Sequence, residues 1–171
     1  MLNNRRFTKV IFPSFFIAMR VLFGLGWLLA GVTKVSTKSW FSEPGVFLTE
    51  YLIESLNKEN VPEFYKYFIE NIALNQIMLF NYVIPIVQIA VGICILLGLM
   101  TLPLIFICLC MHINFILSGN INLISLVLYT SAFTLLLGRK YIYELSLDRY
   151  LGTEKLFKPS HGKVVSLIQT D

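Results

Sequence analysis

Four long apolar segments divide this chain, and they constrain its fold more than any other feature of the sequence. They occupy approximately residues 10–33, 77–100, 102–118 and 121–138. About 20 apolar residues suffice for a helix to cross a bilayer. Only 14% of the chain is charged, against about 25% in soluble domains, so much of its surface requires lipid. The sequence therefore predicts an all-α integral membrane protein with four transmembrane helices.

The connections and the charges predict how these helices are arranged. The last three segments are joined by only a few residues, so neighbouring spans must be antiparallel, as in an up-down bundle. Basic side chains cluster before the first span, at Arg5, Arg6 and Lys9, and again after the fourth span. The positive-inside rule therefore places both termini in the cytoplasm and residues 34–76 outside the plasma membrane. Residues 1–152 then form the membrane domain, and residues 153–171 form a polar cytoplasmic tail.

The outer segment, residues 34–76, contains two predicted helix starts, at Pro44 and Pro62. Apolar side chains recur every four residues behind each start, at Leu48, Leu52 and Leu56 and then at Phe64, Phe68 and Ile72. This spacing favours two short amphipathic helices that lie on the membrane surface or cover the bundle. The alternative is an extracellular loop without regular structure.

Polar side chains interrupt three of the apolar spans at a similar predicted depth. A rise of 1.5 Å per residue places Arg20, Gln88 and His112 roughly 15 Å above the cytoplasmic ends, with Asn114 slightly further out. Each is costly in hydrocarbon unless it is paired, so we expect these groups to satisfy one another. With Trp27 as a packing wall, they predict a polar midplane pocket for a quinone or another small substrate. The alternative is a hydrogen-bond network that only fixes helix register.

Small residues in the first span predict a close contact with another helix. Gly24 and Gly31 lie seven residues apart, nearly two helical turns, and Ala30 is beside them. Such a stripe lets two helix backbones approach each other. Lys34, at the end of the same span, is expected to extend its ammonium group to the outer interface.

Several kinds of site are not supported by the sequence. His112 is the only histidine in the four segments, which disfavours a two-histidine haem or a metal cluster. Cys108 and Cys110 point to different sides of a helix, so they do not form a redox pair. The net charge is +4, but no basic stripe with interleaved aromatics indicates nucleic acid. We predict no haem, flavin or metal cofactor and assign no catalytic residue.

Motifs in the four spans together resemble the DoxX family. The first span carries R-x3-G-x2-W-x2-A-G-x2-K from Arg20 to Lys34, and the second ends in G-x3-L-L-G-L from Gly92. The third ends in M-H-I-N-F from Met111, and L-S-L-D follows the fourth from Leu145. In this order and spacing the chain is similar to DoxX proteins over approximately residues 15–151. That family includes the small subunit of thiosulfate:quinone oxidoreductase.

The resemblance implies a four-helix membrane protein linked in some members to quinone, sulfur or thiol redox chemistry. Members often carry a carboxylate near the position of Gln88, and an amide cannot carry protons in its place. A protein partner or a homo-oligomer is expected, because electrons would have to come from another subunit. The leading hypothesis is a membrane subunit of a quinone-linked oxidoreductase system. The main alternative is a non-catalytic scaffold that recruits redox or detoxifying enzymes, and a small-molecule carrier is a third.

Overall fold

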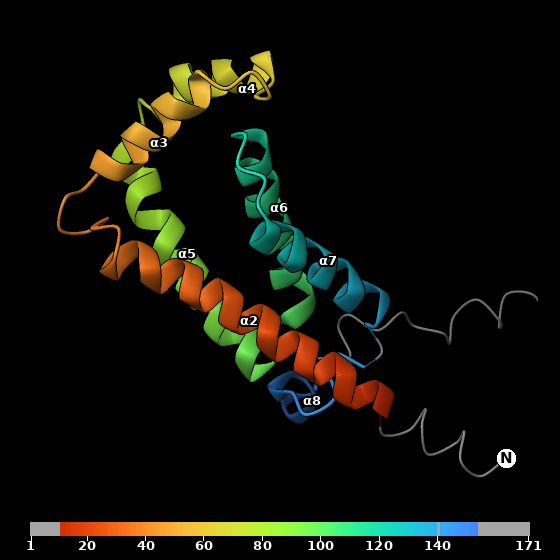
Figure 1. Cartoon of the computed structure of the whole chain (residues 1–171). Coiled ribbons are helices and arrows are strands. Elements are labelled where there is room, and N and C mark those ends of the chain that lie inside the picture. Colours follow the sequence, from red (N-terminus) through yellow and green to blue (C-terminus); the bar gives the residue numbers. More distant parts are fainter. Residues whose placement is uncertain (1–10, 140, 154–171) are drawn as a thin grey trace, which may run out of the picture.

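The computed structural model describes residues 11–139 and 141–153, and every regular element in these ranges is a helix (Figure 1). The four longest helices are α2 (Phe12–Ser36), α5 (Ile77–Leu97), α6 (Thr101–Leu117) and α7 (Leu123–Leu137). Between α2 and α5 the chain forms α3 (Val46–Leu56), α4 (Glu63–Phe68) and the π-helical turn η2 (Ile69–Ala73), and α8 (Leu147–Leu151) follows α7. The all-helical prediction is confirmed for these ranges. The first basic cluster and all of the predicted tail beyond Thr153 lie outside them.

Two helices, α2 and α5, are long and apolar enough to cross a membrane. The other two apolar helices, α6 and α7, are shorter, with 17 and 15 residues. Large apolar side chains are exposed on all four helices, among them Leu22, Leu79, Phe106 and Leu126. An outward apolar surface of this extent suits lipid rather than water, and it associates the chain with a bilayer.

Helices α2 and α5 pack antiparallel and very close together, because glycines line their contact. A Cβ on Gly92 would lie 2.5 Å from the backbone nitrogen of Leu28, and one on Gly31 would lie 2.9 Å from that of Ile89. Gly24 faces Gly92 in the same contact. The close approach predicted at Gly24 and Gly31 is therefore confirmed. Its partner is α5, through Gly92, whose part in the contact the sequence analysis did not identify.

The core of the four long helices also includes the segment after α7. Phe23, Trp27, Ile95, Ile105 and Leu135 pack together from all four helices. Ile142 and Tyr143 are buried in the same cluster, although they follow the end of α7. The chain thus folds back beneath the helices before it enters α8, which lies beside the C-terminal end of α5, and the first turns of α2 run past it (Figure 1). We call this the α8 end.

At the other end, α3, α4 and η2 form a cap with a core of its own (Figure 1). Leu48 and Leu52 are buried in it, as the spacing predicted. In α4 and η2 the predicted face is wrong, because Phe64 and Ile72 are exposed and Tyr65 and Ile69 are buried instead. Both faces of this stretch carry apolar or aromatic residues at four-residue spacing, so periodicity alone does not select the buried one.

Side-chain hydrogen bonds fasten the cap to the end of α6. Tyr51 Oη and Ser118 Oγ are 2.6 Å apart, and Tyr65 Oη donates to the Asn114 carbonyl at 3.1 Å. Lys58 Nζ also donates to Asn120 Oδ1 at 3.2 Å. Because the cap is held at these points, its inner surface closes the space between α5 and α6.

Candidate functional site

Arg20 is buried at the α8 end, away from the other predicted site residues. Its side chain is only 2% exposed. Its Nη1 atom donates to the carbonyl of Ile142 at 2.6 Å and to that of Glu144 at 3.3 Å. Its Nη2 atom donates to the carbonyl of Leu145 at 2.8 Å. The guanidinium group therefore holds the segment that folds back after α7.

A buried carboxylate completes this end of the molecule. Asp148 accepts hydrogen bonds from the backbone nitrogens of Met100 and Thr101, at 2.9 and 3.2 Å, and from Thr153 Oγ1 at 2.7 Å. Met100 and Thr101 begin α6, so Asp148 supplies the acceptor that the first amides of that helix lack. Its negative charge also suits the positive end of the helix dipole. The contacts of Arg20 and Asp148 are those of a structural clamp.

The predicted meeting of Arg20 with Gln88, His112 and Asn114 does not occur. The depth estimate assumed that all spans start at one level. A Cβ on Gly98, which ends α5, would lie 2.9 Å from Arg20 Nη1. Arg20 therefore lies level with the end of α5, and the first turns of α2 extend beyond that helix.

Three of the predicted residues do come together, in a cavity of about 310 Å³ between the long helices and the cap. We call it the polar chamber. Trp27 comes from α2, Gln88 from α5 and His112 from α6. Polar side chains from other elements join them in its lining, namely Lys34, Lys38, Tyr51, Asn120, Asn122 and Ser125. The chamber thus gathers donors and acceptors among largely apolar helices.

Gln88 and Trp27 carry polar atoms that have no protein partner. Gln88 is 1% exposed and Trp27 is 2% exposed. Gln88 Oε1 and Trp27 Nε1 are both buried without a hydrogen-bond partner. A buried polar atom left unpaired costs roughly 1–3 kcal/mol, and such atoms are uncommon in native structures. Trp40, which also lines the chamber, carries a third such atom, its Nε1, so one acceptor and two donors are available to a molecule there.

His112 is fixed between aromatic rings at the wall of the chamber. Its ring centroid lies 5.8 Å from that of Trp27 and 5.4 Å from that of Tyr129. Its Nε2 atom is 2.9 Å from the carbonyl oxygen of Ser125. Since a carbonyl only accepts hydrogen bonds, Nε2 carries the proton of this contact, and in the neutral ring Nδ1 is then an acceptor.

Two lysines give the chamber positive charge. Lys34 Nζ donates to the carbonyl of Ala30 at 3.2 Å and lies 5.4 Å from the centre of the Phe115 ring. Lys38 Nζ lies 4.3 Å from the centre of the Phe47 ring. No aspartate or glutamate lines the chamber among the residues that the structure describes. Lys34 lines this cavity beside the rings of Trp40 and Phe115, and its predicted reach to the outer interface stays a prediction. The chamber favours ligands that are anionic or rich in acceptor atoms.

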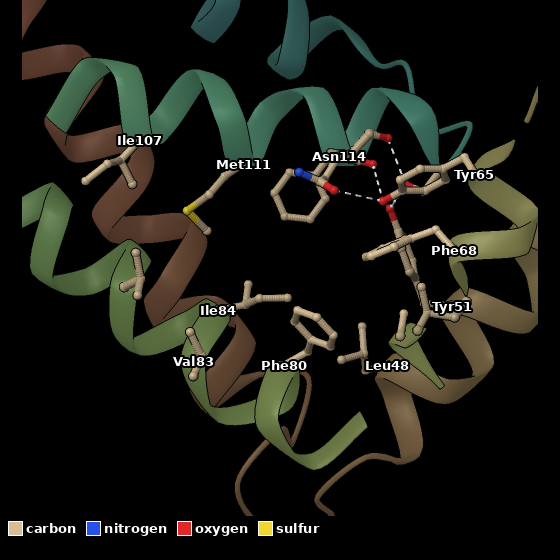
Figure 2. A pocket seen from close by; sticks show the side chains of 15 residues that line it. Leu48, Tyr51, Tyr65, Phe68, Phe80, Val83, Ile84, Ile107, Met111 and Asn114 are labelled. Carbon is tan, nitrogen blue, oxygen red and sulfur yellow. Dashed lines mark hydrogen bonds between the residues drawn. The ribbon is translucent and has the colours of Figure 1, made fainter. Parts of the chain in front are cut away.

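Asn114 lies outside the polar chamber, in a second cavity of about 270 Å³ next to it. We call this cavity the side pocket, and it lies between α5, α6 and the cap (Figure 2). Asn114 Oδ1 accepts from Tyr65 Oη at 3.2 Å, and Asn114 Nδ2 donates to the carbonyl of Cys110. The side chain of Asn114 thus serves to fasten the cap, unlike the other predicted site residues. The sequence did not indicate the side pocket, because the cap that closes it is placed by tertiary contacts.

The described ranges also contain candidate metal ligands and three cysteines. No group of three His, Cys, Asp or Glu side chains there is placed to hold a metal ion. Cys94, Cys108 and Cys110 are free thiols, and Cys108 is buried while Cys110 is exposed. The two closest cysteines therefore point to different sides of α6, as their spacing predicted.

The fold and the two cavities define a helical, apolar protein with a polar internal chamber. No protein-family model, no curated protein and no solved structure matches the chain. The resemblance to the DoxX family accordingly stays a prediction from the motifs.

Proposed function

We propose that this protein is the membrane subunit of a quinone-linked oxidoreductase system of the sulfur or thiol type, and that the polar chamber binds the quinone ring. The observation that carries this proposal is the set of buried, unpartnered atoms on residues that line the chamber, Gln88 Oε1, Trp27 Nε1 and Trp40 Nε1. A ring with two carbonyl groups supplies acceptors for the Trp27 N–H. In its reduced form it supplies hydroxyl donors for the Gln88 carbonyl. The motifs that resemble DoxX proteins agree with this function.

The size and charge of the chamber support the same ligand class. A cavity of about 150 Å³ holds benzene in another protein, so the 310 Å³ of the chamber accommodates a substituted ring. Lys34 and Lys38 favour oxygen-bearing ligands, and Trp27 offers an aromatic face. A quinone, when bound, accepts two electrons and two protons and becomes a quinol. In this proposal the electrons come from a partner subunit that oxidises the sulfur or thiol compound.

The membrane arrangement in this proposal has four spans, with α6 and α7 crossing beside α2 and α5. At 1.5 Å per residue, α6 and α7 measure roughly 26 and 22 Å, less than the approximately 30 Å hydrocarbon core. Helices this short are accommodated by local thinning of the bilayer. The cap then lies outside, and the α8 end and both termini lie in the cytoplasm.

The test is the quinone content of purified protein. We expect wild-type protein to copurify with quinone, and Gln88→Leu and His112→Leu to lose most of it, because each removes a polar group that lines the chamber. Thr134→Val is the control, since Thr134 lies on α7 outside the chamber and bonds its own helix at the Thr130 carbonyl. Wild-type protein that never carries or binds quinone would contradict the proposal.

The non-catalytic scaffold is the second candidate, and the position of Arg20 favours it. Arg20 is the most costly polar residue of the spans, and both of its terminal nitrogens bond to the carbonyls of Ile142, Glu144 and Leu145. If all the polar side chains are structural in this sense, His112→Leu lowers thermal stability and no quinone is found in any variant. The same extraction therefore separates the two candidates.

A further inference from the structure

The polar chamber and the side pocket share one wall. Leu48 and Tyr51 of α3 and Phe115 of α6 line both cavities. The two cavities are therefore neighbours, and these three residues form the wall between them. A molecule whose head lies in the polar chamber therefore has the side pocket beside it.

The side pocket is apolar, and its few polar groups are already paired. Figure 2 shows its walls formed by Phe80, Ile84 and Met111, with Leu48 and Phe68 from the cap. Tyr51 is bonded to Ser118, and Tyr65 to Asn114, as described above. No buried polar atom in its lining lacks a partner among the described residues. An apolar lining whose polar groups are already paired favours a hydrocarbon chain and offers no free hydrogen-bonding group to a polar ligand.

The side pocket also reaches the outer surface of the molecule between α5 and α6. Val83 of α5 and Ile107 of α6 line it, and each is 43% exposed. Such exposed apolar side chains face lipid when the helices cross a bilayer. A chain that lies in the side pocket thus has a route from the polar chamber into the hydrocarbon of the membrane.

From these three observations we infer that the two cavities form one bipartite site, in which the side pocket holds the isoprenoid or alkyl tail of the quinone whose ring lies in the polar chamber. This inference rests on the proposed function and assigns its substrate class: quinones with a long apolar tail, taken directly from the bilayer. Van der Waals contacts of the tail with Ile84, Met111 and Phe68 add affinity, because packing rather than a hydrophobic gain drives association within lipid. Tail-less quinones bind through the chamber alone.

Fluorescence provides a direct readout, because the chain contains two tryptophans and both Trp27 and Trp40 line the polar chamber. A quinone ring in the chamber quenches their emission. The probes are 2,3-dimethoxy-5-methyl-benzoquinone and the same ring with a decyl chain, titrated into purified full-length protein at one fixed detergent concentration. Every comparison is made between variants at that concentration, so partition of the probe into micelles cancels.

Two variants test the side pocket, and a third is their control. Ile84→Phe fills it from α5, and Ala73→Leu fills it from the cap, so a folding defect in one does not remove the test. Ile86→Phe is the matched control, since Ile86 is exposed on the same helix and does not line the side pocket. We expect Ile84→Phe and Ala73→Leu to weaken binding of the decyl quinone at least tenfold and to leave the tail-less quinone within about twofold. Ile86→Phe should change neither.

The outcomes distinguish this inference from the proposed function. If wild-type protein is quenched by neither probe, the quinone function itself is wrong and the inference fails with it. If both probes bind and the filled variants weaken neither, or weaken both equally, the chamber holds quinone but the side pocket does not hold its tail. A copurified phospholipid that remains bound at saturating decyl quinone also overturns the inference, because the side pocket then belongs to a lipid.

Discussion

Arg20 Nη1 lies 2.6 Å from the carbonyl oxygen of Ile142, a residue 122 positions later in the chain. This hydrogen bond connects the first long helix to the segment that follows the last one. Glu144 and Leu145 supply two more carbonyls to the same guanidinium. A positive charge among three carbonyl dipoles thus stabilises the chain reversal that brings Ile142 into the core.

Removal of this guanidinium should destabilise the fold without emptying the polar chamber. Arg20→Met leaves the buried carbonyl of Ile142 and its neighbours without a donor, which costs roughly 2–3 kcal/mol for hydrogen bonds to a charged group. Thermal unfolding in detergent measures this loss. Arg20→Lys should recover part of it, because one ammonium group reaches fewer of the carbonyls.

The control for this change is Arg149→Met. Arg149 is exposed and pairs with Glu144, so its loss should cost less than about 1 kcal/mol. If the two substitutions lowered thermal stability equally, the hydrogen bonds of Arg20 would contribute no more to the fold than an exposed ion pair does. If folded Arg20→Met lost all quinone binding, Arg20 would belong to the quinone site, as the sequence predicted and contrary to the structure.

The close contact of α2 and α5 predicts unequal effects for two glycine substitutions. Gly92→Ala places a methyl group 2.5 Å from the Leu28 backbone nitrogen, which cannot move without shifting α2. Gly26→Ala meets only the side chain of Leu128, with its nearest atom at 2.7 Å, and a side chain can rotate. Both substitutions gain the same helix propensity. The Gly92→Ala variant should therefore be less stable than the Gly26→Ala variant by about 1–3 kcal/mol, the usual cost of overpacking. Similar melting temperatures for the two variants would contradict the structure.

Tyr65 predicts a dependence of stability on alkaline pH. Burial, and secondarily the nearby Tyr51, raises the pKa of Tyr65 from 10.0 to about 12. The folded state therefore favours the neutral phenol, and this contribution is complete below pH 10 and is lost as the pH rises toward 12. Melting curves at pH 8 to 11 should show wild type declining above pH 10, with a smaller decline in Tyr65→Phe.

At pH 8 the Tyr65→Phe variant should itself be less stable by about 1 kcal/mol, because two contacts to Asn114 are lost. Tyr67→Phe is the matched control, since Tyr67 is exposed on the same helix. It should follow the wild type at every pH. A Tyr65→Phe curve that coincides with wild type between pH 8 and 11 would refute this role of the phenol.

The proposed orientation predicts which side of the membrane each end of the molecule faces. In a variant that lacks Cys94, Cys108 and Cys110, a single cysteine is introduced as Glu59→Cys in the cap or Arg149→Cys at the α8 end. A membrane-impermeant maleimide added to intact cells should label only the first. Both should be labelled after permeabilisation. Labelling of Arg149→Cys in intact cells would reverse the orientation.

Local patterns in the sequence were enough to predict the helical class and the kinds of residue that make the contacts. Apolar segments of helical length were visible without any structure, because burial in lipid requires long runs of one kind of side chain. Gly24 and Gly31 indicated a close helix contact, because only small residues permit it. Trp27, Gln88 and His112 were among the five residues predicted for one pocket, since polar groups in apolar helices need partners, but Arg20 and Asn114 were placed there with them.

Which of these groups meet depends on how the helices pack against one another. Residue counting gives the depth of a side chain along its own helix, but it does not give the offset between helices. That offset places Arg20 level with Gly98, and it leaves Arg20 away from His112. The buried face of α4 and the side pocket likewise depend on how the cap docks onto α6. Such docking is set by contacts between residues far apart in the chain, which no local pattern of the sequence records.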